Sequence, residues 1–304
     1  MFKPFVFAAA LSCLTPMVFA QQAVSEIETS EDTFTFIVGA FYANSDSYMN
    51  VTNPRDGGIF PLDFEDDLFL EEKHFLPFFE FAWNFNERHH LYADWKSLHR
   101  SADSPFVEKS WIFTNPDNDK EYIVEAGAKI STTLDIDILR IGYGYDLFLG
   151  DDYNFGASIG VHTMFVKTIF EGEIGICSPT PILQQGHCQD VTANPRVVDN
   201  NTTAPLPNIG LFGSYEFLPG WTIAAHAQYF ALKYDDVKGS LVDIRASVDA
   251  MINENWSLTF GYNYYEVDVD YKQTASAVSI DFHIADYNLN YSFTGPMFAV
   301  MYQF

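Results

Sequence analysis

The sequence predicts an all-β protein, a closed antiparallel transmembrane β-barrel of about ten strands. Three observations support this fold class: many segments alternate apolar with small or polar residues, aromatic residues make up 17% of the chain, and short and long connections alternate along it. An acidic protein in water seldom carries 29 Phe and 17 Tyr on its surface, so this aromatic excess has to face an apolar medium.

The N-terminal segment, residues 1–20, is predicted to be a secretory signal peptide that is not part of the fold. It has one basic residue, Lys3, followed by an apolar run, and Ala20 ends a small-residue cleavage motif. Cleavage after Ala20 would leave residues 21–304 as a single barrel domain. Lipidation at Cys13 is a less favoured alternative. The apolar run is too short for a transmembrane helix, which needs about 20 residues.

Ten segments carry the strand pattern. Because successive side chains of a strand point to opposite faces, each segment divides into an apolar face and a small or polar face. In the segment 256–265, for example, Trp256 and Leu258 share one face while Ser257 lies on the other. The predicted strands are 33–43, 79–86, 90–96, 139–147, 153–165, 209–217, 221–229, 240–252, 256–265 and 297–304.

Two architectures explain such alternation, a soluble β-sandwich and a membrane barrel. A sandwich would bury its apolar faces between two sheets, with fewer large aromatic residues and with strands of about five or six residues. In hydrocarbon every backbone N–H and C=O must be paired internally, which only helices and closed barrels achieve. Strand length and aromatic content favour the barrel, with the apolar face toward lipid and the other face toward a polar lumen.

The connections also favour a barrel, because short turns alternate with long polar segments, as periplasmic turns alternate with extracellular loops. Residues 105–130 have room for an extra hairpin, and twelve or eight strands are the alternatives to ten. Residues 277–296 are expected to extend the last strand above the membrane, with Gly295-Pro296 as its bend. The predicted turns are 86–88, 149–152, 219–220 and 253–255; the predicted loops are 44–73, 101–129, 170–204, 235–239 and 272–283.

The last strand resembles the C-terminal targeting strand of Gram-negative outer-membrane proteins. It ends in Phe304, with Phe298, Val300 and Tyr302 at alternate positions before it. The resemblance, to the broad OmpA-like and porin-like group of small barrels, implies a bacterial outer-membrane location. It also implies contact with outer-membrane lipid and lipopolysaccharide, and recognition by periplasmic chaperones and the barrel-assembly machinery.

Charge and cysteines narrow the partners further. The formal net charge of −25 argues against nucleic acid, because phosphate binding needs a basic surface. Beyond the signal peptide the chain has two cysteines, Cys177 and Cys188, which an oxidising compartment would join as a loop disulfide. A metal site is less favoured, since only His187 accompanies them. The acidic run 63–67 is expected to be solvated loop surface, and no cofactor or metal is predicted.

The polar faces of the predicted strands concentrate charged residues in the lumen. In a ten-stranded barrel the interior is narrow, so these groups are expected to pair into a hydrogen-bonded network that fills it. A small cation-preferring pore lined by acids is the second interpretation. The predicted lumenal charges are Glu80, Asp94, Lys96, Arg140, Asp146, His162, Glu216, His226, Asp243, Arg245 and Asp249.

No catalytic motif is evident in the sequence. His162 and Ser158 share a face but lie about 13 Å apart along a strand, and His89-His90 lies near a predicted periplasmic turn. The favoured function is therefore a passive outer-membrane barrel, either a narrow porin-like channel or a structural surface protein. An enzyme acting on lipid or peptide and a loop-mediated receptor or adhesin are the alternatives.

Overall fold

The computed structural model describes residues 33–52, 59–108, 110–115, 120–176, 194–234, 237–277 and 280–304. The predicted signal peptide and the two cysteines of the predicted disulfide, Cys177 and Cys188, lie outside these residues. Within the described ranges, no helix has the length and apolar character that crossing a membrane requires.

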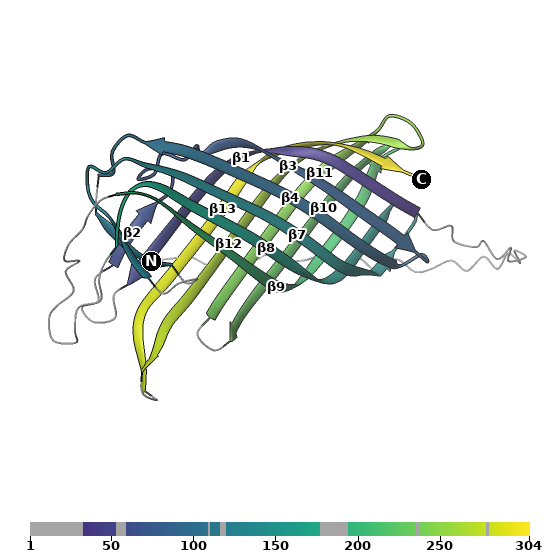
Figure 1. The fold of residues 1–304 in the computed structure, drawn as a ribbon. Helices are drawn as coiled ribbons and strands as arrows, with labels where there is room; N and C mark the ends of the chain where they lie inside the picture. The colour runs from purple at the N-terminus through teal and green to yellow at the C-terminus, as the bar shows by residue number, and fades with distance from the viewer. Residues whose placement is uncertain are drawn as a thin grey trace, which may run out of the picture. The chain divides into compact units, whose positions relative to one another are not determined.

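Ten long antiparallel strands form a closed barrel, which confirms the predicted fold class and strand number (Figure 1). Each strand pairs with its two neighbours, and β8–β9 and β1–β13 pairing completes the circuit. The wall strands are β1 (Thr33–Thr52), β3 (Lys73–Phe85), β4 (His89–Ser104), β7 (Ile130–Leu149), β8 (Tyr153–Ile176), β9 (Asn194–Leu218), β10 (Trp221–Tyr234), β11 (Val237–Met251), β12 (Trp256–Ala277) and β13 (Ile280–Gln303).

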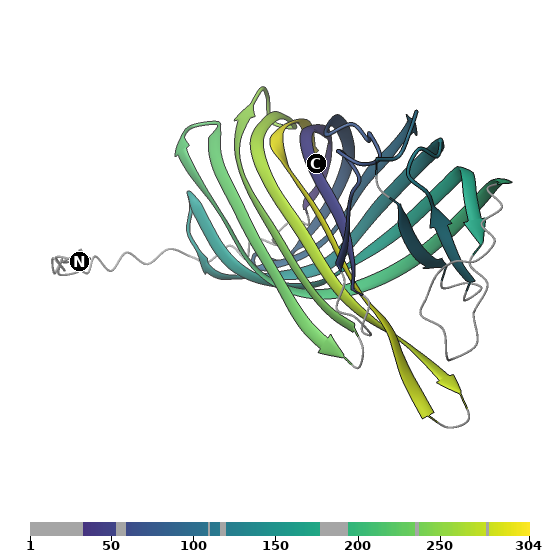
Figure 2. The same cartoon turned by 90° about the vertical axis from the view of Figure 1, so that its left-hand side faces the viewer.

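Three short strands lie outside this circuit. β2 (Ile59–Asp63) pairs with the upper part of β1. β5 (Trp111–Asn115) and β6 (Lys120–Val124) form a hairpin within 105–130, as the sequence allows, and β6 pairs with the end of β8. Figure 2 shows this hairpin beside the barrel. It therefore adds no strand to the wall.

The first and last strands close the barrel. The backbones of Phe34 and Phe304 exchange two hydrogen bonds, of 2.9 and 3.0 Å, and their rings stack with centroids 5.4 Å apart. Phe298 and Phe304 are both about half exposed on the outer face. Val300 and Tyr302 share that face, because they occupy alternate positions of the same strand. The four residues thus form one outward row, and their role as an assembly signal stays a prediction.

The strands are longer than predicted, reaching 25 residues in β9. The predicted loops were wrong in part: β1 continues to Thr52, β9 begins at Asn194, and β12 and β13 include most of 272–283. The physical reason is a change of solvent. Beyond the lipid the outer face becomes polar, so the apolar alternation ends in the sequence although the strand continues.

At this change of solvent, the two faces of the wall exchange their apolar and polar character. In β12, Tyr262 and Tyr264 are exposed on the outside, and the next outward residues are Glu266 and Asp268. Inward residues change in the opposite sense, since Asn263 is followed by Tyr265 and Val267. The periplasmic half is therefore apolar outside and polar inside, whereas the extracellular half resembles a water-soluble barrel.

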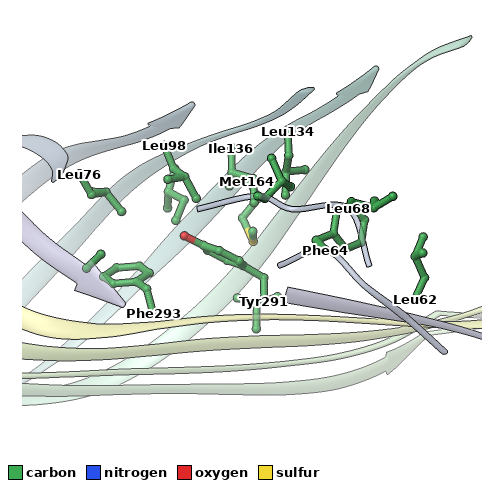
Figure 3. Close-up of a cluster of buried hydrophobic side chains, with 14 of the residues drawn as sticks. Leu62, Phe64, Leu68, Leu76, Leu98, Leu134, Ile136, Met164, Tyr291 and Phe293 are labelled. Atoms are coloured by element: carbon green, nitrogen blue, oxygen red, sulfur yellow. The ribbon is translucent and has the colours of Figure 1, made fainter. Parts of the chain in front are cut away.

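The interior of the extracellular half is an apolar core, so the expected polar lumen was wrong for this half (Figure 3). Inward residues of both sides of the barrel contribute to this one cluster, among them Leu134 of β7 and Phe293 of β13. Residues 59–70, which we call the plug segment, add apolar side chains to this core. The plug residues buried to within 4% exposure are Leu62, Phe64, Leu68 and Leu70.

The predicted bend at Gly295-Pro296 does not interrupt β13. Instead, the β1–β13 ladder is broken there, passing from Phe41↔Met297 directly to Asn44↔Thr294. A Cβ atom on Gly295 would collide with the backbone carbonyl of Tyr42. Glycine is therefore required by the close approach of two strands, and not by a bend.

We expect Gly295→Ala to lower the free energy of unfolding by about 1–3 kcal/mol, because the added methyl group forces the two strands apart. The measurement is the urea midpoint of the barrel refolded in lipid vesicles. Gly239→Ala is the matched control, since its Cβ would have ordinary contacts of 3.7 Å. Equal midpoints for the two variants would contradict the steric argument.

Candidate functional site

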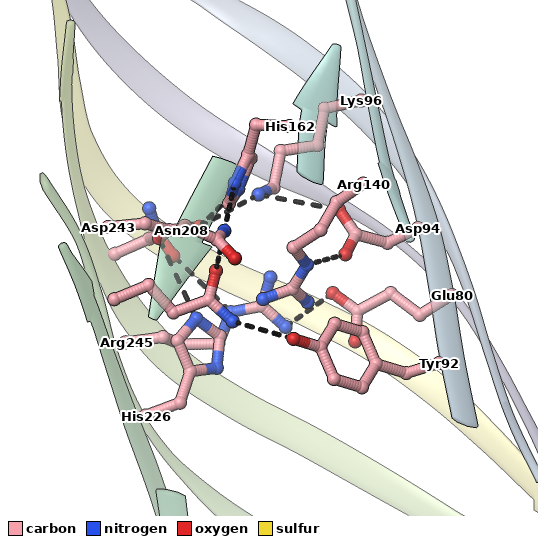
Figure 4. Close-up of polar contacts among 12 residues, drawn as sticks. Glu80, Tyr92, Asp94, Lys96, Arg140, His162, Asn208, His226, Asp243 and Arg245 are labelled. Carbon is pink, nitrogen blue, oxygen red and sulfur yellow. Dashed lines mark hydrogen bonds and ion pairs between the residues drawn. The ribbon is translucent and has the colours of Figure 1, made fainter. Parts of the chain in front are cut away.

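A layer of charged side chains crosses the lumen of the membrane-spanning half (Figure 4). It brings together eight of the eleven charged residues that the sequence placed in the lumen. They come from six wall strands and meet near the barrel centre. The eight are Glu80, Asp94, Lys96, Arg140, His162, His226, Asp243 and Arg245.

Lys96 lies at the centre of this layer, between two carboxylates. Its Nζ donates a hydrogen bond of 3.2 Å to Asp243 of the facing wall and lies 3.5 Å from Asp94 of its own strand. The Arg140 guanidinium pairs with the other oxygen of Asp94. Lys96 and Asp243 are fully buried. Such pairs are held by mutual attraction, because each charge alone would be strongly disfavoured away from water.

A second ion pair joins β11 to β3. The Arg245 guanidinium contacts Glu80 at 2.5 Å and lies 5.5 Å from the ring centroids of both Phe41 and Phe78. Arg140 lies 4.9 Å from the ring of Tyr92 in the same manner. These aromatic faces stabilise the cations electrostatically. Phe41 and Phe78 lie toward the apolar core, whereas Tyr92 lies on the periplasmic side of Asp94 along β4.

Two histidines face the same carboxylate. His162 Nε2 lies 3.7 Å from one oxygen of Asp243, and His226 Nε2 lies 3.6 Å from the other. Both separations exceed a hydrogen bond. His162 Nδ1 contacts the Asn208 amide, which donates to Gln228 at 3.0 Å. The His162 ring is thus positioned by an uncharged neighbour, Asn208.

The uncharged members of this layer were missed by the sequence analysis. Tyr92, Asn208 and Gln228 form a chain of polar contacts across three strands, with Gln228 Nε2 3.4 Å from the Tyr92 hydroxyl. For Tyr92 and Gln228, the alternation of side chains along the predicted strands already gave the inward position. None of the three is charged, so the list of predicted lumenal charges omits them; Tyr92 and Gln228 nevertheless lie on the polar faces of predicted strands.

The other three predicted lumenal charges lie apart from the layer. Asp146 accepts a 2.6 Å hydrogen bond from His90, which therefore lies in the lumen. Glu216 accepts from the backbone N–H of Gly220 at 2.7 Å. Asp249 accepts from Thr259 at 2.6 Å. Each has a local partner near a periplasmic turn, so these three groups serve local structure.

A separate polar cluster holds the plug segment in the extracellular mouth. Arg100 of β4 contacts Glu65 of the plug, and its Nη2 donates to the Ser47 hydroxyl at 2.6 Å. Glu65 in turn accepts from the Ser47 backbone N–H at 2.8 Å and from its hydroxyl at 2.6 Å. We call these three residues the latch. The expectation that 63–67 is solvated surface was wrong for Glu65, whose side chain is 7% exposed.

The latch could not be read from spacing, because its residues lie on three separate segments. Nearby His74 reflects the same environment: burial and the Arg100 guanidinium lower the pKa of His74 to about 4. His74 is therefore neutral at neutral pH and adds no charge beside Arg100. The latch is one buried ion pair with a hydroxyl between its members.

One exposed cluster combines the residue types of a nucleophile–base–acid relay without the geometry of one. Ser97, His99 and Asp137 cluster on the outer face, but Nε2 of His99 lies 3.4 Å from both partners. A nucleophile–base–acid relay needs the two different ring nitrogens. No group of three His, Cys, Asp or Glu side chains in the described part of the chain is placed to hold a metal ion.

We expect Lys96→Met to lower the free energy of unfolding by about 3–5 kcal/mol, because it leaves Asp243 buried without its cation. The double variant Lys96→Met/Asp243→Asn should recover part of the loss. Lys238→Met is the control, since Lys238 pairs with Asp270 at the exposed surface, where a pair is worth at most about 1 kcal/mol. If urea unfolding showed equal losses for Lys96→Met and Lys238→Met, the charged layer would not stabilise the barrel.

The latch makes a second prediction. Replacing Glu65 with Gln removes a charged hydrogen-bond acceptor worth about 1.5–3 kcal/mol, so the plug segment should be cleaved at least about tenfold faster by an added protease. The barrel itself should stay resistant to heating in SDS. Asp66→Asn, at the exposed neighbouring residue, should leave the cleavage rate unchanged. Equal rates for the two variants would show that Glu65 does not hold the plug.

Solved structures of outer-membrane proteins are similar to this chain to different degrees. The outer-membrane protease OmpT from Escherichia coli is similar with a TM-score of 0.54 at 12% identity, over 91% of this chain and 99% of that chain. The Ail protein of Yersinia pestis has a TM-score of 0.30 at 8% identity, over 90% of this chain and 99% of that chain. The Ralstonia pickettii toluene transporter TbuX has a TM-score of 0.34 at 10% identity, over 89% of each chain.

No protein-family model matches the sequence, and no curated protein matches it. At 12% identity, the similarity to OmpT establishes a shared fold. The closed ladder of ten strands agrees with it, and so does the outward band of exposed residues such as Val38, Ile159 and Ile209. The chain therefore has the fold of a Gram-negative outer-membrane β-barrel protein.

Proposed function

We propose that this protein is a closed, non-conducting barrel that serves as a rigid platform on the outer surface of the bacterial outer membrane. One observation carries the proposal: two filled layers are stacked across the interior. The lower one is the charged layer around Lys96 and Asp243, and the upper one is the apolar core with the plug segment.

Both layers oppose the passage of ions. The side chains of Lys96, Asp243 and His162 have no exposed surface, so an ion crossing this level would have to separate buried charges. Above them, Leu241, Tyr265 and the rest of the apolar core exclude water, and an ion would lose its hydration there without replacement. A structural barrel is thus better supported than a narrow porin-like channel.

The platform is the part of the wall above the lipid-facing band. There β8 and β9 reach 24 and 25 residues, and their outward side chains are largely polar, with exposed Val197 as an exception. Outward Asn288 and Asn290 hydrogen-bond to outward carboxylates of β12, with Asn288 Nδ2 3.1 Å from Asp268. This cross-linked polar surface suits contact with partners in water, which leaves a receptor or adhesin role as the finer possibility.

The proposal predicts no stable conductance steps when the purified, folded protein is inserted into a planar lipid bilayer. Insertion is verified separately, by resistance of the reconstituted barrel to heating in SDS and by protection from added protease. Detergent without protein is the blank. Stable, reproducible steps that change size in Lys96→Met would show that ions cross the charged layer, and the platform proposal would then be abandoned.

A further inference from the structure

The wall is incomplete between β9 and β10. Their ladder runs from Trp221↔Leu218 to Tyr229↔Ile209 and no further. β9 nevertheless continues upward, paired with β8 as far as Asn194, and β10 continues to Tyr234, paired with β11. Figures 1 and 2 show the two strands diverging above this point. We call the opening between them the lateral gap.

Two prolines explain why the ladder stops. Continuing the register of Tyr229↔Ile209 would place Pro207 opposite Ala231 and Pro205 opposite Lys233. Proline has no backbone N–H and cannot donate to a neighbouring strand. Pro205 and Pro207 occupy alternate positions and both pair with β8, so the missing donors belong to the edge facing β10. The sequence of β9 itself thus keeps the gap open.

The gap connects the lipid-facing band with the apolar core. On the outside, Ile209 and Tyr229 flank its lower end and are 66% and 55% exposed. On the inside, Leu206 and Phe230 converge beside Gly239, each 3.7 Å from the position of a Cβ on that glycine. Leu206 is buried, and Phe230 packs partly exposed against the core. An apolar path therefore leads from lipid through the wall.

We propose that the lateral gap binds an acyl chain of a neighbouring outer-leaflet lipid, which enters from the band at Ile209 and Tyr229 and contacts Leu206 and Phe230. We identify the occupant as an acyl chain because the apolar outer surface at the entrance of the gap is continuous with the lipid-facing band. The gap begins directly above Ile209 and Tyr229, the last pair of the β9–β10 ladder, so its lower end lies within reach of outer-leaflet chains.

A peptide strand added to the open edge of β9 is the competing occupant. Strand addition is driven by backbone hydrogen bonds along the edge. Pro205 and Pro207 remove two successive donors from the edge next to the band, which is how natural proteins protect exposed edges. The two prolines do not interfere with apolar contacts at this edge. The edge chemistry therefore favours an acyl chain over a strand.

Photo-leucine, a diazirine analogue close to leucine in size, tests the proposal in the intact protein within isolated outer membranes. Irradiation followed by peptide mapping reports which leucines become bonded to lipid. Leu211, 51% exposed on the outer face of β9, is the positive control, and Leu134, buried in the core on β7, two strands from β9, is the negative control. We expect lipid adducts at Leu206 and Leu211 and none at Leu134.

A closing variant makes the test specific. Pro205→Thr/Pro207→Thr restores the two donors and should extend the ladder, so that adducts at Leu206 fall to the level at Leu134 while those at Leu211 persist. Pro195→Thr, at the far end of the same strand, should change neither. If the closing variant does not fold, as judged by its behaviour on heating in SDS, Gly239→Leu fills the inner side of the gap and should also remove the Leu206 adduct.

Three results would overturn the proposal. Adducts at Leu211 without any at Leu206 would mean that the gap is sealed to lipid. Equal adducts at Leu206 and Leu134 would mean that lipid reaches the core by another route. A peptide instead of a lipid bonded to Leu206 would show that the open edge receives a strand.

Discussion

The structure depends on the need to pair every backbone polar group where the wall meets hydrocarbon. Ten strands in one closed antiparallel ladder satisfy this need, and the alternation of side chains then assigns one face to lipid and one to the lumen. The same wall continues beyond the lipid, where water replaces hydrocarbon outside. The faces exchange character at that level, as Tyr264 gives way to Glu266 outside and Asn263 to Tyr265 inside.

This exchange produces two different interiors stacked in one barrel. In the membrane-spanning half the inward groups are polar, and burial forces charges to pair across the lumen, as Lys96 does with Asp243. In the extracellular half the inward groups are apolar and form a core like that of a soluble protein. The plug segment completes this core, and the latch of Arg100, Glu65 and Ser47 is the polar contact that holds it in place.

The closed-ladder requirement is relaxed where water can satisfy the backbone. The wall opens between β9 and β10 only above the last pair that borders the lipid-facing band, at Tyr229 and Ile209. Pro205 and Pro207 would be excluded from a paired edge lower in the wall, and here they define where pairing ends. A surface platform and a lateral site for an acyl chain are compatible, since the charged layer below keeps the interior closed toward the periplasm.

The sequence by itself determined the barrel, its ten strands and the inward position of residues such as Asp94, Lys96 and Arg140, because a period of two assigns faces without knowledge of partners. It underestimated strand length, because an outer face in water lacks the apolar signal used to find strands. Tertiary structure alone decided which inward residues meet. Lys96 and Asp243 are 147 positions apart and Arg100 and Glu65 are 35 apart, and such pairs depend on register and curvature around the whole barrel.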